Sequence, residues 1–316
     1  MKWGIIGLGN IANKFAKTLN IMNEELYAVA SRDLSKAKSF KDEYNAKICY
    51  GSYLELINDN NVDVIYIATP NNMHFDIAIE ALRHNKNVLC EKPLTTNHIL
   101  AKELYDYAKN NNLFIMEALW IYFLPLYKKL KELLPKIGNI KEINVSYGFD
   151  TNDKRKERKF DSNLAGGALL DIGVYNLGFI TMILGFDIID IKSNYHLNEY
   201  NTDDYEEITL KYKNNIIAKS ITQIGKDIKR EAYIKGDMVT IYIPDFQSFE
   251  IFYLNDEKYE CKFDINGFEY QILEVINSIK ENRNESKIYN STNSIKLMKL
   301  LYDIRMSWNM KFNFEK

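Results

Sequence analysis

The sequence opens on MKWGIIGLGNIANKFAKTLN, residues 1–20, and this stretch decides the fold. A short apolar run at residues 3–6 leads directly into Gly7-Leu8-Gly9-Asn10-Ile11-Ala12, and residues 11–20 have the apolar spacing of an amphipathic helix. A G-x-G-x-x-A turn between a strand and a helix indicates dinucleotide binding. Its first glycine permits a tight turn, its second lets the backbone approach a pyrophosphate, and the small Ala12 lets the helix pack on the strand. A glycine turn that only joins a strand to a helix is the alternative interpretation.

Alternation of strand and helix continues to about residue 118. Apolar residues fill nearly every position of the runs, which is typical of parallel strands covered on both faces. The expected strands span residues 3–6, 26–30, 64–68, 87–90 and 113–116, and the expected helices span residues 11–20, 35–44, 74–83 and 99–110. This order predicts an α/β fold whose N-terminal Rossmann dinucleotide-binding domain covers residues 1–118.

Beyond this point the pattern changes to period-two alternation, so residues 119–316 are predicted to form an α+β substrate-binding and dimerisation domain. Its mostly antiparallel open sheet is expected to include residues 140–149, 207–212, 216–221 and 238–243. Helices near residues 126–134, 169–184, 267–282 and 291–307 are candidates to cover one face of that sheet. The other face has to meet something, so we expect a homodimer, with Tyr233, Ile241 and Ile243 as candidates for its interface.

The composition excludes several classes of partner. Lysine and arginine number 41 against 43 aspartate and glutamate, and a net charge of −2 gives no positive field that would hold nucleic acid. The three cysteines form no CxxC pair and the histidines show no metal-ligand spacing, so neither disulfides nor a metal site is expected. No apolar run reaches the ~18 residues of a spanning helix, and the N-terminus shows no signal-peptide pattern. We therefore expect a cytoplasmic protein with no membrane partner.

The end of the second expected strand bears on the choice of cofactor. Enzymes specific for NAD carry an acidic residue there for the ribose hydroxyls, whereas this chain has Ser31-Arg32-Asp33. A guanidinium can bind a 2′-phosphate through two hydrogen bonds, and the Ser31 hydroxyl can donate a further one. This pattern favours NADP(H). NAD(H) is the alternative if Arg32 lies in solvent while Asp33 caps the next helix and also reaches the ribose.

Four further segments carry chemically active side chains. They are Ala68-Thr69-Pro70-Asn71-Asn72-Met73-His74, Cys90-Glu91-Lys92-Pro93-Leu94, Met116-Glu117-Ala118-Leu119-Trp120 followed by Pro125, and Gly166-Gly167-Ala168-Leu169-Leu170-Asp171-Ile172-Gly173-Val174-Tyr175. Together with the glycine loop, they resemble the Gfo/Idh/MocA family of oxidoreductases over nearly the whole chain. The last two segments resemble its branch of dimeric dihydrodiol dehydrogenases and sugar and anhydrosugar oxidoreductases.

This resemblance implies where the cofactor and the substrate bind. Glu91 and Lys92 would lie beside the nicotinamide, with Pro93 in a cis peptide, while Asp171 and Tyr175 would project from one helix toward the same pocket. His74 either contacts the ligand or braces its own loop. The implied cofactor contacts are Gly7, Gly9, Asn10, Ile11, Ser31, Arg32, Thr69, Asn71, His74, Glu91 and Lys92. In many family members the open sheet of the second domain forms the dimer interface.

Lys92, Tyr175 and Asp171 are the candidate catalytic residues. Asp171 and Tyr175 are four residues apart, so they share a face of a helix. Hydride reduction of a carbonyl needs a proton donor near the forming alkoxide. Inositol dehydrogenases of the family have a histidine at the position that matches Tyr175, so here the donor is a phenol. An ammonium at Lys92 would either favour the phenolate or hydrogen-bond the substrate oxygen, and both roles stay open; Tyr175 as a core tyrosine is the structural alternative.

Trp120 and Phe149 are the aromatic residues expected against the substrate, where a flat apolar wall suits a sugar face or a ring diol. Either could instead belong to the core. The branch commonly has an arginine two residues after this tryptophan, whereas this chain has Tyr122. The basic run at residues 153–159 is read as a solvated loop, with Arg158 closing over the site as the functional alternative.

Three hypotheses follow for the function. The first is an NADP(H)-dependent oxidoreductase acting on a secondary alcohol or carbonyl of a sugar, anhydrosugar, polyol or trans-dihydrodiol. The second is an NAD-dependent inositol or sugar dehydrogenase, which Tyr175 and Ser31-Arg32 count against. The third is a catalytically silent dinucleotide-binding sensor, which the retention of Lys92, Asp171 and Tyr175 counts against.

Overall fold

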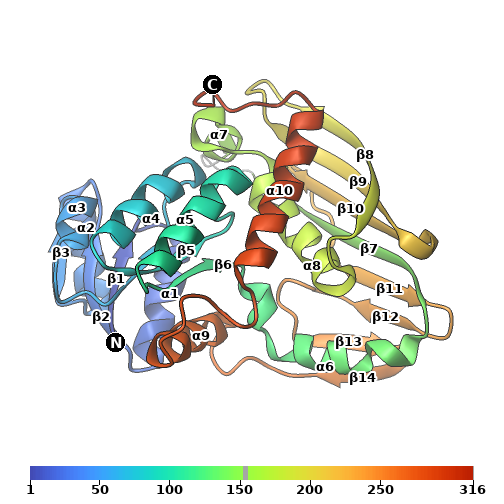
Figure 1. Ribbon diagram of the computed structural model, residues 1–316, viewed down its shortest axis with the longest axis horizontal. Coiled ribbons are helices and arrows are strands. Elements are labelled where there is room, and N and C mark those ends of the chain that lie inside the picture. The colour runs from blue at the N-terminus through green and yellow to red at the C-terminus, as the bar shows by residue number, and fades with distance from the viewer. Residues whose placement is uncertain (152–155, 316) are drawn as a thin grey trace. The chain divides into compact units, whose positions relative to one another are not determined.

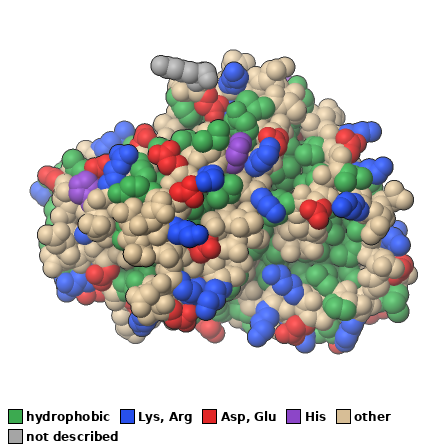
Figure 2. Space-filling model, in the orientation of Figure 1, with side chains coloured by type: hydrophobic (Ala, Val, Ile, Leu, Met, Phe, Trp, Pro, Cys, Tyr) green, Lys and Arg blue, Asp and Glu red, His purple; other side chains and the backbone are tan. Residues whose placement is uncertain are grey.

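The computed structural model describes residues 1–151 and 156–315, which form two compact units (Figure 1). The first unit contains Met1–Trp120 and Asp264–Met298, and the second contains Ile121–Phe263 and Lys299–Lys316. The charged surface is mixed: on the face drawn in Figure 2, basic and acidic side chains are interspersed and form no extended patch of one sign.

The first unit is a Rossmann fold built on a six-stranded parallel sheet. The strand order is β3-β2-β1-β4-β5-β6, so the direction of winding reverses between β1 and β4. The strands are β1 (Lys2–Ile6), β2 (Glu25–Ala30), β3 (Ile48–Tyr50), β4 (Val64–Ile67), β5 (Asn87–Glu91) and β6 (Ile115–Ala118). All four residues of β4 are buried, which confirms the expectation of a sheet covered on both faces.

Three helices of this unit begin at polar caps that the sequence supplies. Asp33 caps α2, Ser52 forms a capping box with Glu55 on α3, and Asn97 caps α5. The helices are α1 (Asn10–Ile21), α2 (Leu34–Tyr44), α3 (Tyr53–Ile57), α4 (His74–Arg83), α5 (His98–Asn110) and α9 (Phe268–Lys280). The expected helices at residues 11–20, 35–44, 74–83 and 99–110 are therefore present, while β3 and α3 were not anticipated.

The second unit is built on an eight-stranded sheet in the order β14-β13-β12-β11-β7-β10-β9-β8. Its strands are β7 (Ile140–Phe149), β8 (Ile188–Leu197), β9 (Asp203–Tyr212), β10 (Ile217–Ile224), β11 (Ala232–Gly236), β12 (Thr240–Ile243), β13 (Ile251–Leu254) and β14 (Glu257–Glu260). Neighbouring strands are antiparallel except for β7 and β10, which run parallel. The expected mostly antiparallel sheet is confirmed.

Alternate residues of these strands face a helical layer. On β10, Ala218, Ser220, Thr222 and Ile224 are buried, while the residues between them are more exposed. The helix α8 (Val174–Leu184) packs on β7 and β10 and is buried along its first two turns. The second unit also contains α6 (Pro125–Leu133) and α7 (Lys156–Phe160). The helix α10 (Ser291–Ser307) is divided, with its residues up to Met298 in the first unit and the rest in the second.

Two expectations need correction. The expected second domain at residues 119–316 includes Asp264–Met298, which belongs to the first unit because α9 packs on α1 and Asn266 donates a hydrogen bond to Thr18 over 2.8 Å. Of the candidate interface residues, Ile241 and Ile243 are fully buried in the core. They share the helix-facing side of β12, and only Tyr233 lies on the other side.

The stretch Ser162–Leu184 is long and apolar enough to pass as a membrane span, which the sequence analysis did not anticipate. Most of it, 78% of the most apolar window, is buried inside the protein. It ends in α8, the helix that covers the sheet, so its composition is explained by the core of the second unit.

Candidate active site

The carboxyl end of β1 leaves room for close approach by a ligand. Gly7 has a φ of +89°, and a Cβ atom there would lie 2.7 Å from the carbonyl carbon of Ala68, so this position requires glycine. A Cβ atom on Gly9 would meet nothing within 4 Å. Gly9 precedes α1, whose first turn has no acidic residue and no side-chain cap. The first N–H groups of a helix lack intrahelical partners, so Asn10 and Ile11 present donors that fit a pyrophosphate.

The carboxyl end of β2 presents one exposed cation. Asp33 is engaged as the cap of α2, where its Oδ1 accepts hydrogen bonds from the backbone N–H groups of Ser35 (2.9 Å) and Lys36 (3.3 Å). Ser31 is buried, and its hydroxyl accepts a hydrogen bond from the backbone of Asp33. The side chain of Arg32 is exposed. Arg32 is therefore the charged group that this edge offers to a phosphate.

The loop after β4 carries a buried hydroxyl and a buried imidazole. The Thr69 hydroxyl meets no hydrogen-bond partner within the described part of the chain, and Asn71 opens the following 3-10 turn. His74 is fully buried, with Nδ1 2.8 Å from the Pro93 carbonyl and Nε2 3.0 Å from the Thr69 carbonyl. Burial lowers the pKa of His74, so the neutral ring donates to one of these two carbonyls. His74 thus braces two loops, while the orphaned Thr69 hydroxyl and the open side of Gly9 fit a bound dinucleotide.

The carboxyl end of β5 carries Glu91 and Lys92. Glu91 is buried, and its Oε1 accepts a hydrogen bond of 2.5 Å from the Tyr66 hydroxyl, whose ring stacks on Phe15. Burial raises the pKa of Glu91, against the opposing effects of Tyr66 and Lys92. Lys92 is half-buried, and the peptide bond between Lys92 and Pro93 is cis, as expected.

Glu117 anchors the loop that carries Lys92, a role that the sequence analysis did not assign. Its fully buried carboxyl accepts hydrogen bonds from the Leu94 backbone (2.9 Å), the Tyr289 hydroxyl (3.0 Å) and the Ser294 hydroxyl (2.6 Å). Burial raises the pKa of Glu117. A glutamate inside an otherwise apolar strand was the available signal, because buried acids require partners.

In the second unit, Asp171 and Tyr175 lie on one continuous helical segment. Residues Leu169–Gly173 form a π-helical turn that runs directly into α8, so Asp171 lies in the π turn and Tyr175 in the first turn of α8. Tyr175 is 6% exposed and Asp171 is half-buried. Single π turns occur frequently at functional sites. The expected helix is present, but its first turn is wider than an α-helix.

Lys159 is a charged residue beside this segment that the sequence analysis treated only as part of a basic loop. Its Nζ lies 3.4 Å from Asp171 Oδ2 and 3.7 Å from the centroid of the Phe149 ring. Neighbouring Arg158 is exposed. The rest of the basic run, residues 153–155, lies outside the described residues, and only the backbone is described for residues 156 and 157.

Two buried acids lie beneath the π turn. Asp203 Oδ2 accepts a hydrogen bond of 2.6 Å from the backbone of Leu169, the first residue of the turn. Cβ atoms on Gly167 and Gly173 would lie 2.2 Å from Asp203 Oδ1 and 2.5 Å from Glu206 Oε1, respectively. Burial raises the pKa of both carboxyls, and the charge of Asp203 raises that of Glu206 further. Asp203 therefore supports the backbone before Asp171 by a hydrogen bond, while Glu206 packs closely against the backbone after it.

Comparison with known proteins decides the family. Residues 1–119 match the oxidoreductase family with an NAD-binding Rossmann fold named GFO/IDH/MocA, and residues 127–231 match the C-terminal domain of the same family. A trans-1,2-dihydrobenzene-1,2-diol dehydrogenase of Xenopus tropicalis is 36% identical over 271 residues, covering 84% of this chain and 81% of the relative. The chain belongs to the GFO/IDH/MocA family of oxidoreductases.

Other similar proteins span the full length. The human trans-1,2-dihydrobenzene-1,2-diol dehydrogenase is 30% identical and covers 100% of this chain and 99% of its own. A 3-ketoreductase from Actinomadura kijaniata, solved with NADP and TDP-benzene, has a TM-score of 0.88 at 22% identity, with 97% of each chain covered. An aldose-aldose oxidoreductase from Caulobacter crescentus has a TM-score of 0.85 at 19% identity, covering 98% of this chain and 97% of its own. The two structures share the fold of this chain over nearly its full length.

Two aromatic residues of this family member lie in its core. Trp120 is 6% exposed, its ring packs edge-on against Phe268 at 5.3 Å, and the Lys14 ammonium lies 4.5 Å from the ring centroid. Tyr122, which replaces the arginine common in the branch, is also buried and donates a hydrogen bond of 3.0 Å to the Gly178 carbonyl of α8. The hydroxyl of Tyr122 thus braces the helix that carries Tyr175.

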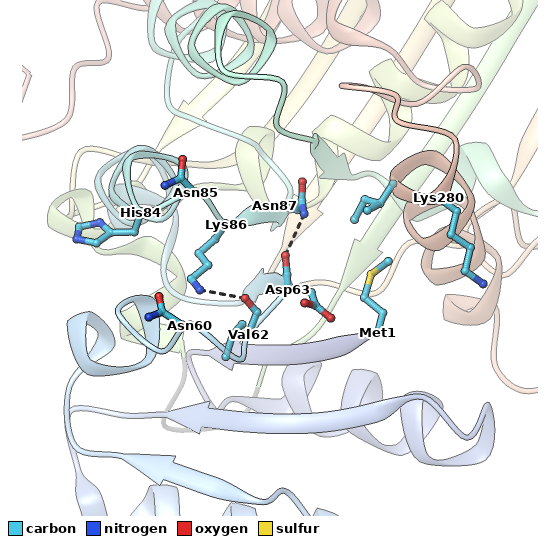
Figure 3. Close-up of a pocket in the computed structure, with 10 residues that line it drawn as sticks. Met1, Asn60, Val62, Asp63, His84, Asn85, Lys86, Asn87 and Lys280 are labelled. Atoms are coloured by element: carbon cyan, nitrogen blue, oxygen red, sulfur yellow. Dashed lines mark hydrogen bonds between the residues drawn. The ribbon is translucent and has the colours of Figure 1, made fainter.

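One pocket of the GFO/IDH/MocA fold lies away from the expected site. It measures about 590 Å³ and lies at the amino ends of the parallel strands, between Met1, Asp63 and Asn87 (Figure 3). The Lys86 ammonium beside it donates to the carbonyls of Asp59 and Val62, and the Asn87 amide donates to the Asp63 carbonyl. None of the predicted site residues lines this pocket. The described residues also contain no cluster of three or more side chains that could hold a metal ion.

Proposed function

We propose that the protein is an NADP(H)-dependent oxidoreductase that transfers hydride between nicotinamide and a secondary alcohol or carbonyl of a sugar, anhydrosugar, polyol or trans-dihydrodiol. The proposal rests on the space and the polar groups at the carboxyl edge of the parallel sheet. There, Gly9 faces open space and Thr69 has a buried hydroxyl that meets no partner within the described residues. The names of the relatives, dehydrogenases of a dihydrodiol and reductases of sugars, support the substrate range.

The cofactor preference rests on Arg32. With Asp33 engaged as a helix cap, the exposed guanidinium is available to a 2′-phosphate through two parallel hydrogen bonds. The A. kijaniata ketoreductase was solved with NADP, which supports the same choice. The contacts to the rest of the cofactor would come from the glycine loop and from Ser31, Thr69, Asn71, Glu91 and Lys92, with His74 holding the Thr69 loop.

Acid–base chemistry would be carried by Tyr175, Lys92 and Asp171. When bound, the nicotinamide supplies or accepts the hydride. Tyr175 gives its phenolic proton to the carbonyl oxygen during reduction and takes it back during oxidation. Lys92 would hydrogen-bond the substrate oxygen, and its positive charge would stabilise the developing alkoxide. Asp171 orients the substrate and sets the charge of the site.

Two alternatives make different predictions. An NAD-dependent inositol or sugar dehydrogenase would bind NAD(H) at least as tightly as NADP(H), whereas a guanidinium at Arg32, which can bind a 2′-phosphate through two hydrogen bonds, favours the latter. A catalytically silent sensor would bind the cofactor without turnover. The retention of Lys92, Asp171 and Tyr175 favours an enzyme over a sensor, because a binding site alone needs no proton donor.

We also infer a homodimer that acts in the cytoplasm, without nucleic acid or membrane as partner. The face of the eight-stranded sheet opposite α8 carries Tyr233, Tyr242 and Tyr253 in one row across β11, β12 and β13. Tyr233 is 37% exposed, and tyrosine is enriched at protein interfaces. The net charge of −2 supports the exclusion of nucleic acid.

A substrate screen tests the proposal. The purified protein is mixed with NADPH and a panel of sugar carbonyl compounds, or with NADP⁺ and a panel of sugars, polyols and trans-dihydrodiols. The near-ultraviolet absorbance of the reduced nicotinamide reports turnover. NADP-linked turnover in at least one panel is expected. Tight NADPH binding without turnover in either panel would favour the sensor instead.

A further inference from the structure

Lys159 is held at a fixed place by its own backbone. Its carbonyl accepts a hydrogen bond of 2.8 Å from Gly167 N–H, and a Cβ atom on Gly166 would lie 2.3 Å from the same carbonyl oxygen. The next residue, Phe160, is buried in a cluster with Ala168, Ile172 and Ile224, and its carbonyl accepts a hydrogen bond from Thr202. These contacts therefore anchor the backbone of Lys159 to the core of the second unit.

The ammonium of Lys159 lies between two residues that the proposed function places at the substrate. It is 3.4 Å from Asp171 Oδ2 and 3.7 Å from the centroid of the Phe149 ring. The side chains of Lys159 and Asp171 are 31% and 32% exposed, so this pair is open on one side. An ammonium has three N–H bonds, and Asp171 is the one acceptor that Lys159 reaches among the residues the structure describes. At least one N–H bond therefore remains for a ligand.

This arrangement changes what Phe149 offers to a substrate. A bare aromatic face suits the apolar ring of a diol or the C–H face of a sugar. Here the ammonium covers the ring face at van der Waals distance, so a ligand on this side meets a charged donor instead of a flat apolar wall. A donor next to the Asp171 acceptor matches neighbouring hydroxyl groups, each of which can both accept and donate.

We propose that Lys159 is a specificity-determining residue, which donates a hydrogen bond to a substrate hydroxyl beyond those of the reacting carbon and its neighbour and so favours polyhydroxylated substrates over ring diols. This inference rests on the proposed function, because it requires Asp171 and Phe149 to face the substrate. A trans-dihydrodiol has two hydroxyl groups, one on the reacting carbon and one on the neighbouring carbon. It therefore has no further hydroxyl that Lys159 could bind. A sugar has further hydroxyls that the Lys159–Asp171 pair can bind, and a site that hydrogen-bonds such a group discriminates against an analogue that lacks it.

The test compares Lys159→Met, which keeps the length of the side chain but removes its charge, with Lys159→Arg, which retains a donor. Lys213→Met is the matched control, because it removes an exposed lysine charge in the turn between β9 and β10, a position with no proposed role in the site. Each protein is assayed with NADP⁺ against D-glucose, D-xylose and trans-1,2-dihydrobenzene-1,2-diol. Sugar affinity for the NADP⁺ complex is also measured by calorimetry, and circular dichroism reports folding.

Lys159→Met is expected to lower kcat/KM for the sugars by about 10- to 100-fold, mainly through KM and the calorimetric Kd, as for a lost charged hydrogen bond. For the dihydrodiol the change should be under about threefold, Lys159→Arg should recover part of the sugar activity, and Lys213→Met should match the unmodified protein. The inference would be overturned if folded Lys159→Met lost kcat/KM equally for the sugars and the diol, or lost it for neither. It would also be overturned if the wild-type protein turned over the diol but no sugar. Wild-type protein that binds NADPH but turns over neither class would instead refute the proposed function itself.

Discussion

Tyr175 differs from phenylalanine by the one hydroxyl on which the proposed proton transfer depends. Tyr175→Phe is expected to leave NADPH affinity unchanged and to lower kcat by the ~10²- to 10⁴-fold typical of a lost general acid. Lys92→Met should lower kcat at least as much, because it removes the charge that is proposed to stabilise the alkoxide. Asp171→Asn should lower kcat less, because it leaves the proposed proton donor in place. Stopped-flow measurement of hydride transfer separates these effects from product release. Near-normal turnover in Tyr175→Phe with none in Lys92→Met would make the lysine the acid.

Arg32 decides between the two nicotinamide cofactors. Arg32→Ala should raise the Kd for NADPH by the equivalent of about 1.5 to 3 kcal/mol, the strength of a hydrogen bond to a charged group, and should hardly change the Kd for NADH. Nicotinamide fluorescence titration measures both constants. Lys36→Ala, a change to an exposed cation in the first turn of α2, serves as the control. Equal affinity of the unmodified protein for the two cofactors would refute the preference.

Glu117 connects three segments of the first unit: β6, the loop after Lys92, and the polypeptide at Tyr289 and Ser294. Glu117→Ala removes the carboxylate that accepts hydrogen bonds from the Leu94 N–H group and from the Tyr289 and Ser294 hydroxyls, and a buried donor that loses its acceptor costs about 1–3 kcal/mol. We expect a lower urea midpoint and, because the loop bears Lys92, a fall in kcat that exceeds the change in the Kd for NADPH. Ser294→Ala removes one donor and keeps the Leu94 bond, so it should lower the midpoint less and leave kcat unchanged. A fall in stability alone would limit Glu117 to a structural role.

The acids under the π turn predict a pH dependence of stability. Burial raises the pKa of Asp203 and Glu206, so above about pH 4 the folded chain keeps a proton that the unfolded chain has released. The free energy of unfolding then falls as pH rises toward the folded-state pKa values, by up to about 1.4 kcal/mol per pH unit for one proton. Glu206→Gln removes one titrating group and should flatten this fall. Urea unfolding of both proteins at about pH 5, 6, 7 and 8 measures the slopes, and parallel slopes would contradict the expectation.

The elements differ in how far the sequence predicts them. Residues 74–83 and 291–307 match their helices at both ends, because apolar spacing over ten or more residues is a strong signal. The strand β3 has three residues, too few to show a period, and β14 reads EKYE, an exposed edge strand with no apolar face to mark it. The π turn was read as a regular helix because a five-residue change of winding leaves the apolar pattern intact.

The site was predictable where a backbone requirement dictates the residue, and less so where packing decides. Gly7 and the cis bond before Pro93 are where the motifs put them. Lys159 was overlooked, since a lysine in a basic run looks solvated until the chain folds it onto Phe149. Trp120 packs beside Phe268, which lies 148 residues further along the chain, a contact that no local pattern shows, and its place against the substrate stays a prediction.

Packing between segments far apart in the sequence also decides how the whole molecule divides into units. The amphipathic pattern of residues 267–282 predicts a helix, and α9 is present, yet the pattern does not say which neighbour receives its apolar face. In the folded chain that neighbour is α1, so Asp264–Met298 joins the first unit although the sequence has already passed through the second sheet. A boundary drawn once along the sequence cannot represent such a return.

The last prediction concerns the oligomeric state, and it follows from the face of the eight-stranded sheet opposite α8. By strand register, Tyr233 lies between Asn144 and Tyr242, and its ring stacks on that of Tyr242 at 4.6 Å. A two-fold axis through this face would bury the aromatic row against its own copy, so light scattering at micromolar concentration should give twice the 37.0 kDa of one chain. Tyr233→Glu would place a charge near its symmetry mate and should yield monomers, while Met238→Glu, in the exposed turn between β11 and β12, should remain dimeric. An unmodified protein that scatters as a single chain would show that this face stays open to solvent.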